Sequence, residues 1–184
     1  GPAGDTDVNL VLEQLPIVTP EAGARFGAPP PDAFTIAPAL VQPTSRGSVT
    51  LASSNFKDAA VVDGNYLGTD QDLAAIVRAI ESARELGNQK AFDEVRESEA
   101  VPGPKATAED LRELAQLASA SFGHPVGTCK IGADKLAVVD PELRVHGITG
   151  LRVADASVMP RIITGPTNAP THMIAGRAAK LILG

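Results

Sequence analysis

An apolar stripe at helical spacing in residues 70–86 constrains the fold most strongly. Positions three and four apart lie on one face of a helix, and Gly87, directly after the stripe, is typical of a helix end. Such a face is stable only when it is buried, so this helix must pack against other parts of the chain. The members of the stripe are Leu73, Ile76, Val77, Ile80 and Ala83.

A second helix is predicted from Thr107 onwards. The hydroxyl of Thr107 can cap a first turn that contains Glu109 and Asp110, and acidic residues there favour the positive end of the helix. The proline- and glycine-rich residues 101–105, just before it, predict a loop. The apolar face is expected to comprise Leu111, Leu114, Ala115, Ala118 and Phe122.

Short strands are predicted in the N-terminal part of the chain. Residues 8–17 form an apolar run that is compatible with a strand leading into an irregular, proline-rich segment, and a partner outside this chain is compatible with it. The runs 34–43 and 48–53 predict two strands joined by a turn, which together form a hairpin. With the helices, these strands predict a chain of mixed α+β structure.

Composition excludes several classes of protein. The chain has 43% apolar residues, enough for a packed core, whereas a formal charge of −6 and 3% aromatic residues disfavour nucleic acid as a partner. No window approaches the roughly 20 apolar residues of a membrane span, so a soluble chain is expected, and the cytoplasm is only slightly favoured as its compartment. The single cysteine, Cys129, is expected to be a buried, inert thiol, and no metal site is predicted.

His124 is the first candidate for chemistry. Pro125 disfavours helical geometry at this histidine, and the flanking Gly123 and Gly127 allow the backbone to come close to another surface. An imidazole held there can accept a proton near neutral pH, because its unperturbed pKa is about 6.5. From the spacing alone, a structural or surface histidine is the simpler interpretation.

Residues 138–141 and 143–145 predict a strand, a turn and another strand. His146 follows them and is most simply a turn residue. Residues 151–157 then predict a strand that ends at Asp155, followed by small side chains. This arrangement lets a cofactor approach the main chain, although a plain strand end with a turn aspartate is the simpler interpretation of the stretch alone.

A C-terminal helix is predicted with Asn168 as its N-cap and Pro170 as an early helical residue. A helix start presents free N–H groups and a positive dipole end, which suit a carboxylate, a phosphate or an anionic ring oxygen. The apolar stripe of this helix comprises Ile174, Ala178, Leu181 and Ile182.

In this order, the C-terminal motifs closely resemble those of the glucose–methanol–choline (GMC) family of FAD-dependent alcohol oxidases and dehydrogenases. The motifs are GHPVGT at 123–128, VDP at 139–141, LRVADASVMP at 151–160 and NAPT at 168–171. A weaker resemblance upstream covers residues 33–40, 43–47 and 65–67, so most of the chain is included. In the family these segments belong to a substrate-side antiparallel sheet and to the C-terminal strand and helix that complete the FAD-binding α/β domain.

The resemblance implies a catalytic role for His124. It matches the family histidine that faces the flavin N5 region and takes the hydroxyl proton of the substrate as general base while hydride leaves the adjacent carbon. The family usually has a second histidine or asparagine where this chain has Pro166 on the substrate side. Proline offers no hydrogen-bond donor there. A proline at this position resembles the pattern of the pyridoxine 4-oxidase-like branch of the family, whose substrates carry a hydroxymethyl group on an aromatic ring.

The resemblance also implies contacts with FAD. Asp155 and Ala156 match positions beside the pyrophosphate and ribityl chain. Thr167 and Asn168 match the stretch whose backbone approaches the flavin C2 carbonyl, and the helix from Ala169 directs its positive end there. That end would stabilise the negative charge that develops on the reduced ring.

The resemblance therefore implies the C-terminal part of an enzyme that oxidises a primary alcohol to an aldehyde. The sequence contains no GxGxxG nucleotide-binding motif, so activity is expected only with an N-terminal FAD-domain chain as partner. The implied division is an irregular lead-in at 1–33, substrate-side sheet and helices at 34–122, and an active-site and FAD-contacting segment at 123–184. A flavin-dependent lyase or decarboxylase of the same family, and a non-catalytic binding module derived from it, stay open as alternatives.

Overall fold

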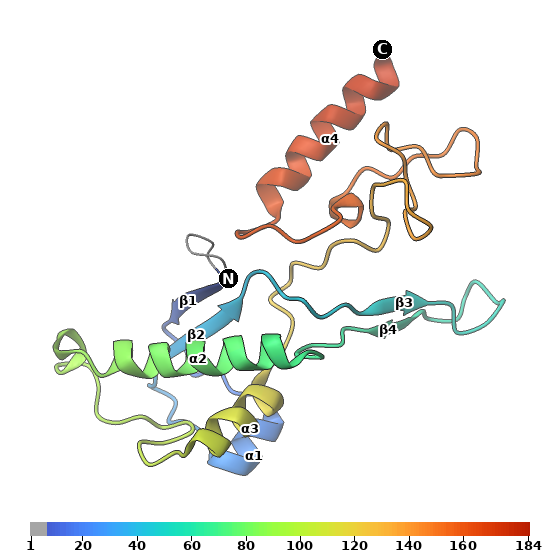
Figure 1. Cartoon of the computed structure of the whole chain (residues 1–184). Coiled ribbons are helices and arrows are strands. Elements are labelled where there is room, and N and C mark those ends of the chain that lie inside the picture. The colour runs from blue at the N-terminus through green and yellow to red at the C-terminus, as the bar shows by residue number, and fades with distance from the viewer. Residues whose placement is uncertain (1–6) are drawn as a thin grey trace. The chain divides into compact units, whose positions relative to one another are not determined.

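Short strands and helices alternate along residues 7–184, which the computed structural model describes (Figure 1). The described residues form a mixed α+β fold, as predicted, with two small antiparallel sheets. The elements are β1 (Val8–Glu13), α1 (Pro20–Phe26), β2 (Thr35–Leu40), β3 (Ser48–Thr50), β4 (Val61–Asp63), α2 (Asp70–Gly87), η1 (Lys90–Phe92), α3 (Ala108–Ala118), η2 (Ala156–Val158) and α4 (Asn168–Leu183).

The chain divides into two units. The first unit combines the residues up to Gly47 with Gly64–Ala120. The second unit combines Ser48–Asp63 with Ser121–Gly184. These units are defined by contacts and not by the role of each segment, so the functional division at residues 33 and 122 stays a prediction. The expectation of an irregular lead-in is wrong for α1, a helix within that segment.

The strand pairing differs from the predicted hairpin. β2 pairs antiparallel with β1, from Val8 opposite Leu40 to Glu13 opposite Thr35, and β3 pairs with β4. The two runs predicted to pair with each other therefore belong to different sheets. Alternation of apolar residues indicates a strand but does not specify its partner, and the partner of β1 lies within this chain.

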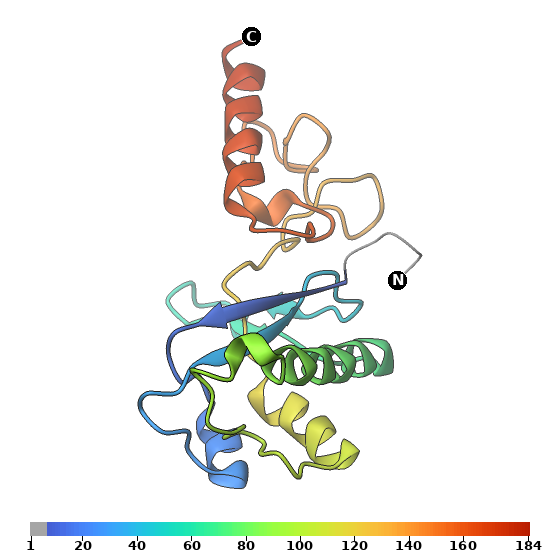
Figure 2. The same ribbon diagram turned by 90° about the vertical axis from the view of Figure 1, so that its left-hand side faces the viewer.

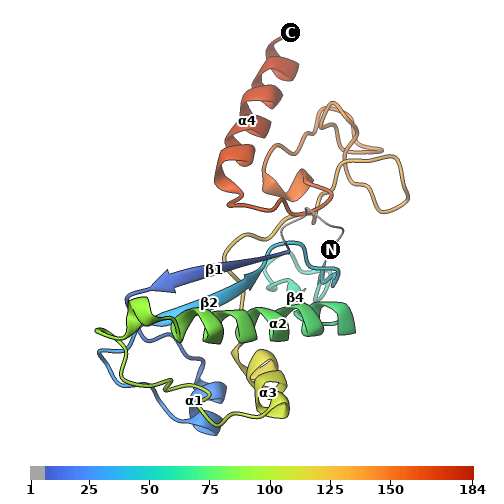
Figure 3. The same ribbon diagram turned by 60° about the vertical axis from the view of Figure 1, so that its left-hand side comes forward.

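The core of the first unit forms where α2 meets α3. The predicted stripe is buried at Leu73, Ile76 and Ile80, and it packs against Leu111 and Ala115 of α3. Figures 2 and 3 show α2 running along the β1–β2 ribbon, with α1 beside α3, in agreement with the contacts between these elements. The long helix was thus correctly predicted from its spacing.

Threonine side chains cap the three helices of this unit. The hydroxyl oxygens of Thr19, Thr69 and Thr107 each accept a hydrogen bond from the main-chain N–H of the third residue of α1, α2 and α3, respectively. The predicted cap at Thr107 is confirmed and forms a capping box with Asp110. However, α3 ends at Ala118, and the Phe122 side chain, predicted on its apolar face, is 61% exposed.

A buried carboxylate ties the start of α2 to the segment that follows β2. Asp72 is 2% exposed, and its two oxygens accept four hydrogen bonds from the main-chain N–H groups and hydroxyls of Thr44 and Ser45, at 2.6–2.8 Å. Burial alone would raise the pKa of Asp72, but the hydrogen bonds from Ser45 and Thr44 outweigh it and lower the pKa.

The lowered pKa of Asp72 predicts a loss of stability in acid. The folded-state pKa lies below the unfolded value of about 3.9, so the contribution is present above that value and disappears as the pH falls through the folded pKa. Urea unfolding of the chain between about pH 6 and 2 should therefore show a decline that is shallower in Asp72→Asn. Parallel declines in the two proteins would contradict this assignment.

The second unit has its own small core. Val139, Leu143, Val158 and Ala178 are buried together, the last of them on α4. The strands predicted at residues 138–145 and 151–157 are not continuous; they are reduced to isolated bridges, such as Arg144 to Arg152. Alternating side chains alone cannot make a strand, which needs a neighbour to accept its ladder of hydrogen bonds.

α4 buries less of its apolar stripe than predicted. Ala178 is buried, and Ile174 and Leu181 are partly buried against the same core, whereas Ile182 is 60% exposed. Within residues 7–184, no helix is long and apolar enough to cross a membrane.

Candidate functional site

His124 lies on an irregular segment that leads into the second unit. Gly123 before it has φ of 77°, in the left-handed region that favours glycine, and Pro125 follows it. The imidazole is half-buried, and the ring of Phe122 meets it edge-on, with centroids 5.7 Å apart. On its other side, Nδ1 of His124 lies 3.1 Å from Oγ1 of Thr167.

The contact with Thr167 brings His124 to the N-terminal end of α4. Thr167 is 7% exposed and occupies the N-cap position, so the prediction of Asn168 as N-cap is wrong by one residue. Unlike the threonine caps of the other unit, its side chain makes no hydrogen bond to the start of its own helix. The hydroxyl is instead directed to the imidazole, 43 positions away in the sequence.

The start of α4 therefore has free donors. Within residues 7–184, the structure gives no hydrogen-bond partner to the N–H groups of Asn168 and Ala169, and both residues are exposed. Pro170 has no N–H, and the N–H of Thr171 is bonded to the carbonyl oxygen of Thr167. The first turn thus presents two main-chain donors and the positive end of the helix to its surroundings.

Asp155 and Ala156 form a tight turn in the same unit. Oδ1 of Asp155 accepts a hydrogen bond from the N–H of Ser157 at 2.8 Å, and hydrogen bonding with Ser157 lowers the pKa of the carboxyl group. The turn continues into η2, which contacts α4. Its carbonyl oxygens at Ser157 and Val158 accept from Cys129 and Ile131, so the turn packs beside the segment that follows His124.

The predicted site residues thus gather around the start of α4. His124 and Thr167 are in direct contact, Asn168 and Ala169 begin the helix, and the Asp155–Ala156 turn belongs to the same packed unit. Pro166 precedes Thr167 and is exposed. Cys129 is partly buried rather than fully buried as expected. The groups brought together can accept a proton and donate hydrogen bonds.

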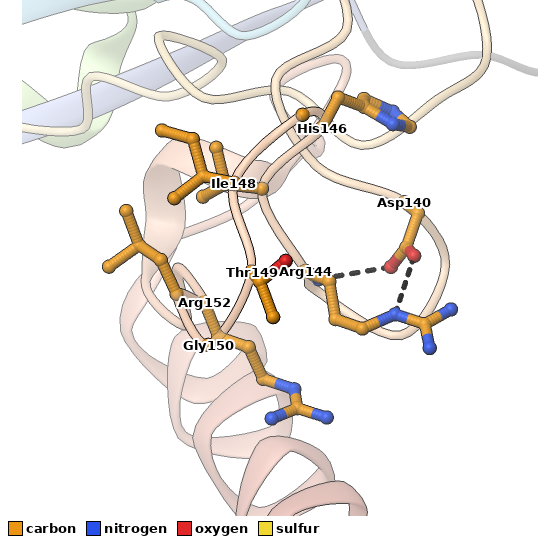
Figure 4. A pocket seen from close by; sticks show the side chains of 10 residues that line it. Asp140, Arg144, His146, Ile148, Thr149, Gly150 and Arg152 are labelled. Carbon is orange, nitrogen blue, oxygen red and sulfur yellow. Dashed lines mark hydrogen bonds and ion pairs between the residues drawn. The ribbon is translucent and has the colours of Figure 1, made fainter.

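A separate hollow in this unit is a poor candidate for a reactive site (Figure 4). It is lined by Asp140 and residues 144–152, and two of its charged groups, Asp140 and Arg144, are bonded to each other. Nε of Arg152 donates to the carbonyl oxygen of Glu142 at 3.3 Å. The carboxylate of Asp140 accepts from the main-chain N–H of Arg144 at 3.0 Å and from its Nε at 2.7 Å. His146 is exposed, and Nε2 lies 3.0 Å from the carbonyl oxygen of Gly132, which agrees with the prediction of a turn residue.

No group of three or more histidine, cysteine, aspartate or glutamate side chains suited to a metal ion occurs among the described residues 7–184.

The chain is similar to proteins of one family of oxidoreductases. The sequence model of the GMC oxidoreductase family matches residues 43–175, and this chain belongs to that family. Over 177 residues it is 36% identical to an alcohol dehydrogenase [acceptor] of Pseudomonas putida, covering 95% of this chain and 32% of the relative. It is 44% identical over 147 residues to an oxygen-dependent choline dehydrogenase of Brucella ovis, covering 76% and 26% of the two chains, respectively.

A solved structure is similar over nearly the whole chain. Pyridoxine 4-oxidase from Mesorbium loti superimposes with a TM-score of 0.87 at 32% identity, over 96% of this chain and 34% of that protein. The chain thus spans about a third or less of the length of these proteins. The family and the fold class predicted from the C-terminal motifs are confirmed, and the residue roles stay predictions.

Two features of the site had no clear signal in the sequence. The side chain of Thr167, predicted to act only through its backbone, contacts His124, and Phe122 lies against the imidazole instead of in a helix core. Thr167 lies 43 positions from His124, so no local pattern indicates that contact. Phe122 lies only two positions from His124, but the helix predicted to include it ends at Ala118.

Proposed function

We propose that this chain is the C-terminal part of an FAD-dependent oxidoreductase that oxidises a primary alcohol to an aldehyde. One observation carries the proposal: the half-buried imidazole of His124 is held by a buried side chain at the start of a helix whose first N–H groups are free. This combination supplies a base and fixed donors side by side, which is what removal of a proton and stabilisation of a negative ring require.

The residues at the start of α4 fit FAD. The N–H groups of Asn168 and Ala169 have no partner within residues 7–184, and they suit an electron-rich ring edge such as the flavin N1 and C2 carbonyl. Asp155 and Ala156 would lie along the pyrophosphate and ribityl chain, where the carboxylate of Asp155 holds the turn by accepting from Ser157. When bound, FAD supplies the acceptor for the hydride and its two electrons.

His124 accepts the hydroxyl proton of the substrate in this proposal. Nδ1 is occupied by Thr167, so Nε2 is the atom available to form the new N–H bond as the O–H bond breaks. The alcohol carbon loses a hydride, and the aldehyde forms without a net charge on its oxygen. The imidazolium that results keeps its contact with Thr167.

Pro166 leaves the substrate oxygen without a second donor from this position. The similarity to pyridoxine 4-oxidase, together with this proline, supports a substrate with a hydroxymethyl group on an aromatic ring. The partner is the N-terminal FAD domain, either in the same polypeptide or in a second chain, because this chain spans only 26–32% of its curated relatives.

A panel of alcohols tests the proposed function. The complete enzyme, loaded with FAD, should turn over pyridoxine or benzyl alcohol with a higher kcat/KM than choline or an unbranched aliphatic alcohol, and the product should be the aldehyde. A preference for choline would overturn the substrate class alone. Failure of every alcohol, with FAD stably bound, would overturn the oxidation itself.

A further inference from the structure

We propose that Thr167 is a positioning residue that fixes the tautomer of His124. Its hydroxyl oxygen accepts a hydrogen bond from Nδ1–H of the neutral imidazole and so leaves Nε2 without a proton. The inference rests on the proposed function, because the tautomer matters only if His124 acts as a base. It concerns the Thr167 side chain, which has no such role in the sequence-based prediction.

The geometry allows only two arrangements of one proton. Oγ1 of Thr167 and Nδ1 of His124 are 3.1 Å apart, so either Nδ1–H donates to the hydroxyl oxygen or the hydroxyl donates to Nδ1. In the second arrangement the neutral ring carries its proton on Nε2 and has no free lone pair for the substrate. Only the first arrangement produces a base at Nε2.

The position of Thr167 suits this role because its backbone is itself held. Its carbonyl oxygen accepts from the N–H of Thr171 at 3.0 Å and from the hydroxyl of Thr171 at 2.6 Å. The side chain belongs to a residue that is 7% exposed, so water has little access to compete for the imidazole. Phe122 meets the ring edge-on, with centroids 5.7 Å apart.

The same contact serves both protonation states of His124. Once Nε2 has taken up a proton, both ring nitrogens carry hydrogen, and Nδ1–H continues to donate to Thr167. No rotation of the ring or of the hydroxyl oxygen is required between the two states. The acceptor at Nδ1 is therefore the same before and after the proton transfer.

Two substitutions at Thr167 separate the effect of the hydroxyl group on kcat from the effect of side-chain packing. In the complete enzyme, Thr167→Val keeps the branched shape but removes the acceptor, and it should lower kcat by about ten- to a hundredfold, the rate equivalent of one hydrogen bond to a charged group. KM and FAD content should change little. Thr167→Ser keeps the acceptor and should restore kcat to within about threefold of the parent enzyme.

Nitrogen NMR reads the tautomer independently of activity. In the chain labelled with ¹⁵N-histidine, His124 should carry its neutral-state proton on Nδ1, and Thr167→Val should move it to Nε2. The assignment uses His124→Ala, because the chain has three histidines. His146→Ala is the control: its side chain is exposed and bonded to the main chain at Gly132, and the tautomer of His124 should not change.

The outcomes distinguish the two proposals. A proton on Nε2 of His124 in the parent chain, or an unchanged spectrum and kcat in Thr167→Val, would overturn the role of Thr167. If Thr167 sets the tautomer but His124→Ala turns over alcohol normally, the positioning stands and the proposed function fails.

Discussion

Replacing His124 with alanine in the complete, FAD-loaded enzyme is expected to lower kcat on a primary alcohol by about 10²–10⁴-fold. The imidazole lies at the start of α4, and Nε2 is the nitrogen that Thr167 leaves available. Without it, the hydroxyl proton must pass to water, which is a far weaker base. KM should change less than kcat, because the role proposed for the ring is in proton transfer and not in binding.

A matched control for this prediction is His146→Ala. His146 is exposed and bonded to the main chain at Gly132, so its loss should change kcat by less than about threefold. Both variants should be compared at equal FAD content and equal thermal midpoint, which separates chemistry from folding. Turnover by His124→Ala within about threefold of the parent would rule out the general-base role.

Replacing Asp72 with asparagine is expected to destabilise the first unit by about 1–3 kcal/mol. The carboxylate accepts four hydrogen bonds from Thr44 and Ser45 in a site that is almost closed to water. An amide places N–H hydrogens where one oxygen now accepts two donors, so buried N–H and O–H groups lose their partners. Urea unfolding of the chain should show a lower midpoint with an unchanged slope.

Glu81→Gln provides the same chemical change on the exposed face of α2. Its side chain lies in solvent, and the expected effect is less than about 0.5 kcal/mol. A double-mutant cycle of Asp72→Asn with Ser45→Ala should then show a coupling of about 0.5–3 kcal/mol, since the two side chains share a hydrogen bond. Equal destabilisation by Asp72→Asn and Glu81→Gln would show that the hydrogen bonds to the Asp72 carboxylate do not stabilise the first unit.

Helices were predicted better than strand pairing, for a physical reason. The stripe of α2 and the cap of α3 at Thr107 are local patterns, so residues a few positions apart suffice to specify them. The pairing of β1 with β2 and of β3 with β4 depends on contacts across intervening turns and loops. α1 was missed, although Thr19, Pro20 and Glu21 form a recognisable cap, first helical residue and acidic first turn.

The candidate site shows the same limit. The motif around His124 and the helix start at Asn168 could be found in the sequence, because each is a short pattern that resembles a family motif. The hydrogen bond between His124 and Thr167 could not be found there, because it joins positions 43 residues apart. The free N–H groups of α4 could be expected only in general terms, since any uncapped helix has them.

Anaerobic mixing of the complete enzyme with a primary alcohol tests whether bound flavin oxidises the alcohol with His124 as base. We expect that the alcohol bleaches the visible absorbance of the bound flavin, that deuterium on the carbinol carbon slows the bleaching, and that His124→Ala slows it by about 10²–10⁴-fold. Fully bound flavin that no alcohol bleaches, or bleaching that is indifferent to both the deuterium and the loss of His124, would contradict it.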